Sequence, residues 1–364
     1  MSADNNAFTS WLELTDIVNP PQNMSPLHIA AHSGMLNYCQ HLIQLGQDVR
    51  GLDDASRTPI SWAAIKGYAN IVAILLENGA DADLDDYEGL KPLHYAAKAN
   101  QFEVVKILLA AGVDPLTPRT KDYSRRRCGN SASAIGHTAL YYACIGGCAE
   151  TVVEFMKYIS TEELDRALGC AANAGKTNVV ITLLESPYIS VDTMAWGVTP
   201  LYSAARQQNP VMIKALLQKG ANPNARSPIS RTPQHKGPHL RGAPRSWGDS
   251  LENEDCRETP LHAAARGFYY RALSTPDKED ILKECCKLLV DAGSDVNAVG
   301  DGGNYPIHYS TSPAITAMLL KHGAEATVTS KNGSTPLHLA CERQAHEKLI
   351  ELLVSHGADI NAKR

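Results

Sequence analysis

The 364-residue sequence has few large aromatic side chains and no long hydrophobic run. It contains only four Phe and four Trp, and because one large core usually uses more, we expect packing by small aliphatic side chains. No stretch reaches the roughly 18 apolar residues that a membrane-spanning helix needs. Asp4, Glu13 and Asp16 interrupt the first 20 positions, which excludes a signal peptide. The sequence therefore predicts a soluble chain with no membrane span.

Cysteine and charge exclude two further classes of protein. The nine Cys are odd in number and irregular in spacing, so they do not form a secreted disulfide scaffold, and we expect free thiols in a reducing compartment. The net charge of −5 and the pI near 6.2 argue against a nucleic-acid-binding surface over the whole chain. We expect an intracellular protein, cytoplasmic or nuclear, in which any contact with nucleic acid is local.

One short phrase recurs along the chain. It first occurs as Ser25-Pro26-Leu27-His28-Ile29-Ala30-Ala31 and returns at intervals of 33 residues at Thr58 and Lys91. Further copies, one of them degenerate, begin at Thr138, Arg166, Thr199, Thr259, Tyr305 and Thr335. Many copies close on paired Leu followed by Gly, as in Leu75-Leu76 with Gly79. This internal repetition predicts a repeat architecture.

Each copy encodes a pair of short helices. Thr before Pro starts the first helix, because the hydroxyl caps free backbone N–H groups and Pro loses no hydrogen bond at the first helical position. A Gly such as Gly67 ends it where a left-handed residue is needed. The second helix has Val72, Leu75 and Leu76 at helical spacing and stops at Gly79, before a turn rich in Asp and Gly. Since no single pair can bury its apolar face, the pairs are predicted to stack as a solenoid with a continuous core.

The phrase and its period resemble those of the ankyrin repeat family, T-P-L-H-x-A every 33 residues, over about residues 23–364. The resemblance implies an all-α ankyrin-repeat solenoid of about nine helix-turn-helix units with β-turn or hairpin fingers. It also implies that the His of the phrase ties adjacent turns together and does not bind a metal. These residues are His28, His94, His262, His308 and His338.

Departures from the period predict where the solenoid is interrupted. We expect insertions in the turns near residues 116–136 and 226–255, and between the two helices of the seventh unit near 271–283. Apolar residues within 1–22 predict an N-terminal capping helix ahead of the repeat domain of residues 23–364. The last unit resembles an internal copy, so either it is its own cap or the chain is a piece of a longer polypeptide.

The residue after the His lies, by the same resemblance, toward the concave groove of such a solenoid. Trp62, Tyr95 and Tyr142 occupy this position in three of the first four units, and a row of exposed aromatic rings is typical of a protein-binding hot spot. The alternative is that the rings only cover the first helices. Cations occupy variable places farther along the same surface: Lys66, Lys98, Arg206, Arg266 and Arg343.

Two of the insertions are basic. Residues 116–136 hold five basic residues and one acidic residue, and residues 226–245 hold five basic residues and no acidic one. The arginines that we single out are Arg125, Arg126, Arg127, Arg231, Arg241 and Arg245. Capture of an acidic or phosphorylated partner by these arginines is one interpretation, and a merely solvated loop is the other.

The sequence offers no recognisable catalytic or metal constellation. No glycine-rich phosphate loop follows a strand, no G-x-S-x-G is present, and Cys144 with Cys148 lacks two further ligands at zinc-site spacing. We expect no catalytic residue, cofactor or metal, and predict a non-enzymatic scaffold or adaptor that binds a protein partner through the groove and the finger loops. Two alternatives stay open: binding of nucleic acid or another anionic ligand through the basic loops, and a recognition domain of a larger enzyme, receptor or ubiquitin-ligase subunit.

Overall fold

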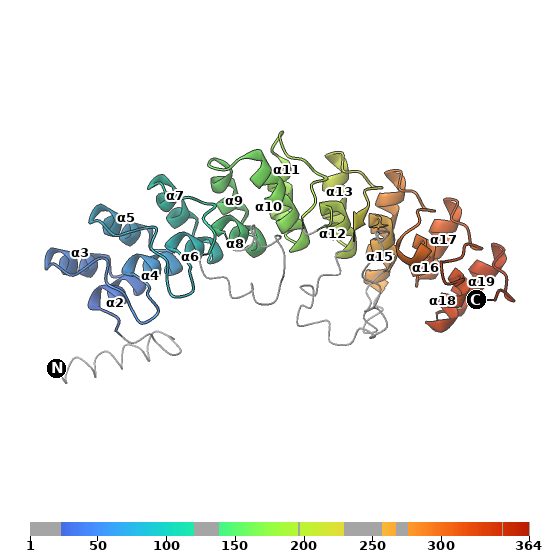
Figure 1. Cartoon of the computed structure of the whole chain (residues 1–364), viewed down its shortest axis with the longest axis horizontal. Coiled ribbons are helices and arrows are strands. Elements are labelled where there is room, and N and C mark those ends of the chain that lie inside the picture. The colour runs from blue at the N-terminus through green and yellow to red at the C-terminus, as the bar shows by residue number, and fades with distance from the viewer. Residues whose placement is uncertain are drawn as a thin grey trace. The chain divides into compact units, whose positions relative to one another are not determined.

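The computed structural model describes residues 23–119, 138–195, 197–228, 257–266, 276–343 and 345–363. Its regular structure is almost entirely helical, and the helices follow one another as pairs of a first and a second helix (Figure 1). The chain divides into two compact units: unit 1, Met1–Gly129 with Ser133–Tyr158, and unit 2, Asn130–Ala132 with Ile159–Arg364. The helix pairs confirm the predicted all-α repeat architecture.

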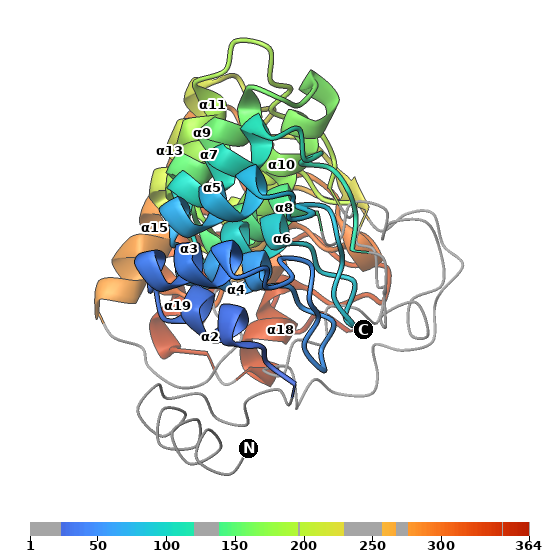
Figure 2. The same cartoon turned by 90° about the vertical axis from the view of Figure 1, so that its left-hand side faces the viewer.

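The described part of unit 1 holds four helix pairs. They are α2 (Pro26–His32) with α3 (Leu36–Gln44), α4 (Pro59–Lys66) with α5 (Ala69–Glu77), α6 (Pro92–Lys98) with α7 (Phe102–Ala110), and α8 (Ala139–Gly146) with α9 (Ala149–Met156). Successive first helices pack on one another, and successive second helices do the same, so unit 1 consists of a first-helix row and a second-helix row. The turns before α4 and α6, which we call fingers, project on the same side of the first-helix row (Figure 2).

Unit 2 continues the same alternation with more variation in helix length. Its helices are α10 (Thr161–Asn173), α11 (Thr177–Leu184), α12 (Pro200–Arg206), α13 (Pro210–Gln218), α14 (Pro260–Arg266), α15 (Pro276–Asp291), α16 (Pro306–Tyr309), α17 (Pro313–Lys321), α18 (Pro336–Glu342) and α19 (Glu347–Ser355). A short antiparallel pair, β1 (Ser227–Pro228) and β2 (Arg257–Glu258), and a 3₁₀ turn, η5 (Asp301–Gly303), complete the regular structure of the described residues.

The predicted helix starts are confirmed at most of the pairs. The hydroxyls of Ser25, Thr138, Thr199 and Thr335 each accept a hydrogen bond from a backbone N–H of the helix that follows. Thr58 differs, because its hydroxyl lies 3.0 Å from the Oγ of Ser61 and makes no such cap. The hydroxyl cap from the phrase is therefore present at α2, α8, α12 and α18, and the helices α4, α6 and α16 begin without a side-chain cap.

Three of the five His of the phrase, His28, His262 and His308, link neighbouring pairs as the resemblance implies. The Nδ1 atom of His262 accepts the backbone N–H of Thr259 at 3.1 Å. Its Nε2 atom lies 3.2 Å from the carbonyl oxygen of Asn304 in the next turn. The Nε2 atoms of His28 and His308 lie 3.0 Å from the next turn's carbonyl oxygen in the same way. One neutral imidazole ring thus accepts a hydrogen bond at the start of its own helix and donates one to a carbonyl of the following turn.

Small side chains fill the space between first helices, as the scarcity of aromatic residues predicts. The Ala pairs of α2, α4 and α6 have no exposed surface, and Phe155 is the largest of the fully buried side chains described. Short side chains let the helix axes approach closely, which tightens the contact between neighbouring pairs. No helix in the described ranges is long and apolar enough to cross a membrane.

Two irregular intervals are accommodated by longer helices. The copies of the phrase at Thr138 and Arg166 are only 28 residues apart, and the second of them lies within α10, which is 13 residues long and is capped by the hydroxyl of Ser160. Part of the third insertion is also helical, because α15 begins at Pro276 and continues for 16 residues. Leu282, Cys286 and Leu289 are buried, whereas Glu279, Asp280 and Ile281 of the extension are exposed, so the helix begins ahead of its buried face, where a connecting loop was expected. The predicted capping helix (1–22), most of the first insertion and nearly all of the second lie outside the described residues.

Gly169, in the middle of α10, permits a close approach of the next turn. A Cβ atom at this position would lie 2.2 Å from the Cβ of Ala195. Ala favours a helix by about 1 kcal/mol over Gly, yet we expect Gly169→Ala to lower the free energy of unfolding by about 1–3 kcal/mol because the added methyl overpacks the contact. Urea unfolding followed by circular dichroism measures this. Adding Ala195→Gly should restore stability, whereas an unchanged or higher midpoint for the single variant would contradict the packing argument.

Candidate functional site

The three aromatic residues singled out in unit 1 lie on successive first helices: Trp62 on α4, Tyr95 on α6 and Tyr142 on α8. The expectation of exposed rings is wrong for Trp62, which is only 6% exposed, because its ring is enclosed by neighbouring side chains. Tyr95 and Tyr142 are half-buried. The row therefore combines one covered ring with two rings that keep a solvent-facing surface.

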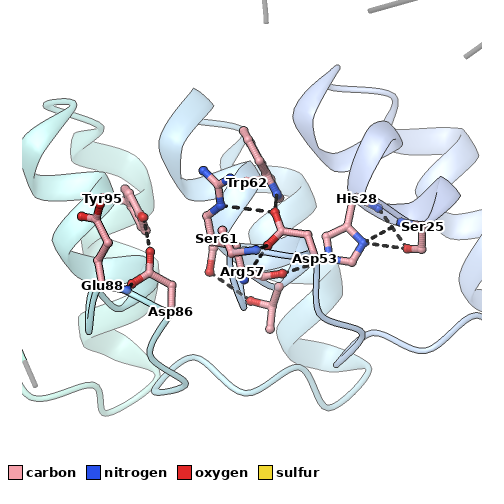
Figure 3. A network of polar contacts seen from close by, with 11 residues as sticks. Ser25, His28, Asp53, Arg57, Ser61, Trp62, Asp86, Glu88 and Tyr95 are labelled. Carbon is pink, nitrogen blue, oxygen red and sulfur yellow. Dashed lines mark hydrogen bonds and ion pairs between the residues drawn. The ribbon is translucent and has the colours of Figure 1, made fainter. Parts of the chain in front are cut away.

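A buried carboxylate in the finger before α4 holds Trp62. Asp53 has a side chain with no exposed surface. Its Oδ2 atom accepts the indole N–H of Trp62 at 3.0 Å and lies 3.2 Å from the Nε atom of Arg57. The Arg57 guanidinium lies 4.1 Å from the centroid of the Trp62 ring (Figure 3). Charge pairing and cation–π stacking together lock this ring against its own finger.

The finger before α6 repeats this arrangement with different residues. Asp86 lies nine residues before Tyr95, as Asp53 lies nine before Trp62, and the Tyr95 hydroxyl donates to its Oδ2 atom (Figure 3). The Oδ1 atom of Asp86 accepts the backbone N–H groups of Glu88 and Leu90, both at 2.8 Å. Burial, and then Asp86, raises the pKa of Tyr95, so its hydroxyl stays a donor. The Tyr95 ring is therefore fixed before any partner arrives.

Tyr142 is held by ring contacts. Its ring centroid lies 6.0 Å from that of His94, which comes from the preceding pair, and 5.8 Å from that of Tyr141. Both contacts are edge-to-face, with interplanar angles of 83° and 71°. Edge-to-face packing orients a ring without using its whole surface. Tyr142 thus extends the row beyond Tyr95 with one part of its ring still accessible.

Two exposed lysines stand beside the rings. Lys66 is four residues after Trp62 on α4, and Lys98 is three residues after Tyr95 on α6, spacings that bring side chains to the same helix face. Neither ammonium group forms an ion pair with another described residue. Burial, and then the charge of Lys66, lowers the pKa of His32 to about 4. We call Trp62, Tyr95, Tyr142, Lys66 and Lys98 the aromatic–lysine face.

The arginines predicted to contribute to this surface in unit 2 have partners within the chain. Arg206 is exposed, and its Nη2 atom donates to the Oδ1 of Asn173 at 2.8 Å. Arg266 was expected to add positive charge to this surface, but its guanidinium pairs with the fully buried carboxylate of Glu258 and stacks on the Tyr309 ring at 4.2 Å. The Nη1 atom of Arg343 donates to the carbonyl of His308 at 2.9 Å.

Arg266 belongs to a polar cluster that sequence reasoning missed. The Tyr202 hydroxyl donates to the Oε2 of Glu258 at 3.1 Å across 56 residues of sequence. Burial, and then Glu258, raises the pKa of both Tyr202 and Tyr309, so both hydroxyls stay protonated. We call Tyr202, Glu258, Arg266 and Tyr309 the Glu258 cluster. It stabilises the base of the second insertion, since Glu258 also pairs with Ser227 across β1 and β2.

The loop arginines, a metal site and a cavity are the other candidates for a functional site. The six loop arginines, Arg125, Arg126, Arg127, Arg231, Arg241 and Arg245, lie outside the described residues. Within the described ranges no group of three or more His, Cys, Asp and Glu is placed to hold a metal ion. A cavity of about 470 Å³ opens on the last pair of unit 2 and is lined mainly by apolar side chains, including Leu337, Ile350 and Val354. The aromatic–lysine face is therefore the strongest candidate site.

Comparisons with known proteins agree on the repeat. A family model described as "Ankyrin repeats (3 copies)" matches residues 5–86, 27–119, 88–163, 156–227 and 278–364. Rabankyrin-5 of Mus musculus is 28% identical over 183 residues, 48% of this chain and 14% of that protein. Ankyrin repeat and SOCS box protein 16 of Mus musculus is 28% identical over 216 residues, 46% of this chain and 47% of that protein.

Among solved structures, the human ASB11 ankyrin repeat domain resembles the chain with a TM-score of 0.52 and 21% sequence identity. The match covers 75% of this chain and 99% of that domain, and it shows the fold. The chain spans less than half the length of these two curated relatives.

Proposed function

Because the chain belongs to the ankyrin repeat family, we propose that it is a non-enzymatic module that binds a protein partner on the aromatic–lysine face of unit 1. Ankyrin repeats are generally protein–protein interaction modules. A standard interface covers about 800 Å² on each partner, an area that several adjacent helix pairs supply. The proposal places the contact where fixed rings and exposed cations coincide.

The observation that carries the proposal is the anchoring of Tyr95 by Asp86. The hydroxyl is used inside the finger, while part of the ring stays exposed. An aromatic side chain that is ordered before binding loses little conformational entropy in the complex, which favours affinity. Tyrosine is also among the residues that dominate binding energy at interfaces. Trp62 contributes little accessible surface of its own, because only 6% of it is exposed.

Affinity capture tests the proposal. The double variant Tyr95→Ala with Tyr142→Ala removes both accessible rings, and we expect the recovery of bound proteins to fall about tenfold, equivalent to about 1.4 kcal/mol. The matched control is Tyr38→Ala with Tyr158→Ala, because both of these rings are exposed outside the first-helix row. Equal recovery of the same proteins by the parent chain and the Tyr95 and Tyr142 variant would refute this site.

The alternative of nucleic-acid binding depends on the loop arginines and is separated from the proposal by salt. Binding to phosphates weakens by several orders of magnitude between about 50 and 200 mM salt when many contacts are made. Binding on the aromatic–lysine face weakens far less over that range, because only two cations contribute and the ring contacts are mainly apolar. Capture repeated at both salt concentrations therefore distinguishes the two modes.

A further inference from the structure

We propose that the aromatic–lysine face takes an acidic, proline-rich segment of its partner in the polyproline II conformation. The inference rests on the proposed function and adds the chemistry of the bound segment. Charge, spacing and ring accessibility each support it from residues of unit 1.

The first step is charge. Lys66 and Lys98 are exposed and have no carboxylate partner among the described residues. The carboxylates of the nearby fingers already have partners. Asp53 and Asp86 accept hydrogen bonds inside their own fingers. Glu88 pairs with Arg119 at 3.2 Å and Asp83 with Lys91 at 2.9 Å. The two ammonium groups therefore favour carboxylates supplied by another molecule.

The second step is spacing. Lys66 ends α4 and Lys98 ends α6, and these two helices pack directly on each other. Packed helices have axes about 8–10 Å apart. A polyproline II segment rises about 3.1 Å per residue with three residues per turn, so residues i and i+3 face the same side about 9 Å apart. A β-strand repeats its side every two residues, about 6.6 Å, which does not match the helix spacing.

The third step is the aromatic surface beside the lysines. Tyr95 is fixed by Asp86 and keeps part of its ring exposed, and Tyr142 repeats the aromatic position one pair later. Grooves lined by aromatic rings bind proline-rich segments, because the extended segment is already ordered before it binds. Acidic residues at i and i+3 would then meet the two lysines, while the prolines between them pack on Tyr95 and those that follow reach Tyr142 on the next first helix.

Fluorescence anisotropy with synthetic peptides tests the inference on the full chain. The probe is a fluorescein-labelled peptide of three Glu-Pro-Pro repeats. A Glu-Gly-Gly peptide keeps the charge and removes the polyproline conformation, and a Lys-Pro-Pro peptide reverses the charge. We expect the Glu-Pro-Pro peptide to bind at least fivefold more tightly than the Glu-Gly-Gly peptide, and the Lys-Pro-Pro peptide to show no saturable binding.

Matched lysine variants assign the binding to this face. Lys66→Gln with Lys98→Gln should weaken Glu-Pro-Pro binding at least tenfold, whereas Lys106→Gln with Lys214→Gln removes the same charge from exposed second-helix positions and should leave it unchanged. The loop arginines are present in both variants, so their contribution cancels. Equal binding by the two variants, or equal affinity for the Glu-Pro-Pro and Glu-Gly-Gly peptides, overturns the inference. The capture experiment with Tyr95 and Tyr142 decides the proposed function separately.

Discussion

Replacing Arg266 with Met is expected to lower the free energy of unfolding by about 3 kcal/mol, because it leaves a buried carboxylate without its cation. The Glu258 side chain has no exposed surface, and that of Arg266 is 24% exposed. Met keeps much of the apolar contact with Tyr309 while removing the charge. Urea unfolding followed by circular dichroism measures the loss, and hydrogen exchange in α12 and α14 locates it in unit 2.

A second variant separates charge from packing. In Glu258→Gln with Arg266→Met, no charge is left in the cluster, and the Gln carbonyl still accepts the hydroxyl of Tyr202. We expect this double variant to recover most of the stability, because removing both members of a buried ion pair costs far less than removing one. If the double variant is as unstable as Arg266→Met, the loss comes from packing and the ion-pair argument is wrong.

Acidification is expected to destabilise the chain between about pH 6.5 and pH 4 through buried histidines. Burial lowers the pKa of His262 to about 4, although Glu258 and hydrogen bonds oppose the shift. An unfolded His titrates near 6.5, so within this window the unfolded state binds more protons than the folded state. The contribution of His262 to the free energy of unfolding is complete above pH 6.5. It decreases by up to about 1.4 kcal/mol per pH unit as the pH falls toward 4.

The measurement is the urea midpoint of unfolding at several pH values from 4 to 7. His32, whose pKa is also lowered to about 4, acts in the same direction. His262→Gln should make the urea midpoint less dependent on pH, because Gln carries no titrating proton. The same change also disturbs the hydrogen bond to the Asn304 carbonyl. His356→Gln changes an exposed residue and should leave the profile as it is. A midpoint that does not change between pH 6.5 and 4 in the parent chain would contradict the burial argument.

The exposure of the candidate rings illustrates where sequence reasoning reaches its limit. Asp53 and Asp86 stand nine residues before Trp62 and Tyr95, so the sequence contains a signal for the anchors. The bonds themselves depend on how each finger turns back on its helix. Ser56 and Gly89, with φ of 58° and 79°, occupy the left-handed region that permits this turn. A spacing of nine residues alone does not show that the carboxylate and the ring meet.

The sequence by itself determined the repeat, the helix pairs and most helix starts, because caps such as Thr199 and breakers such as Gly67 act within a few residues. Only the tertiary structure decided which side chains stay accessible. Trp62 is covered, Arg266 is neutralised by Glu258, and α15 includes the last eight residues of the predicted insertion. Burial and ion pairing join residues that are far apart along the chain, as Tyr202 and Glu258 are, and local patterns carry no information about such contacts.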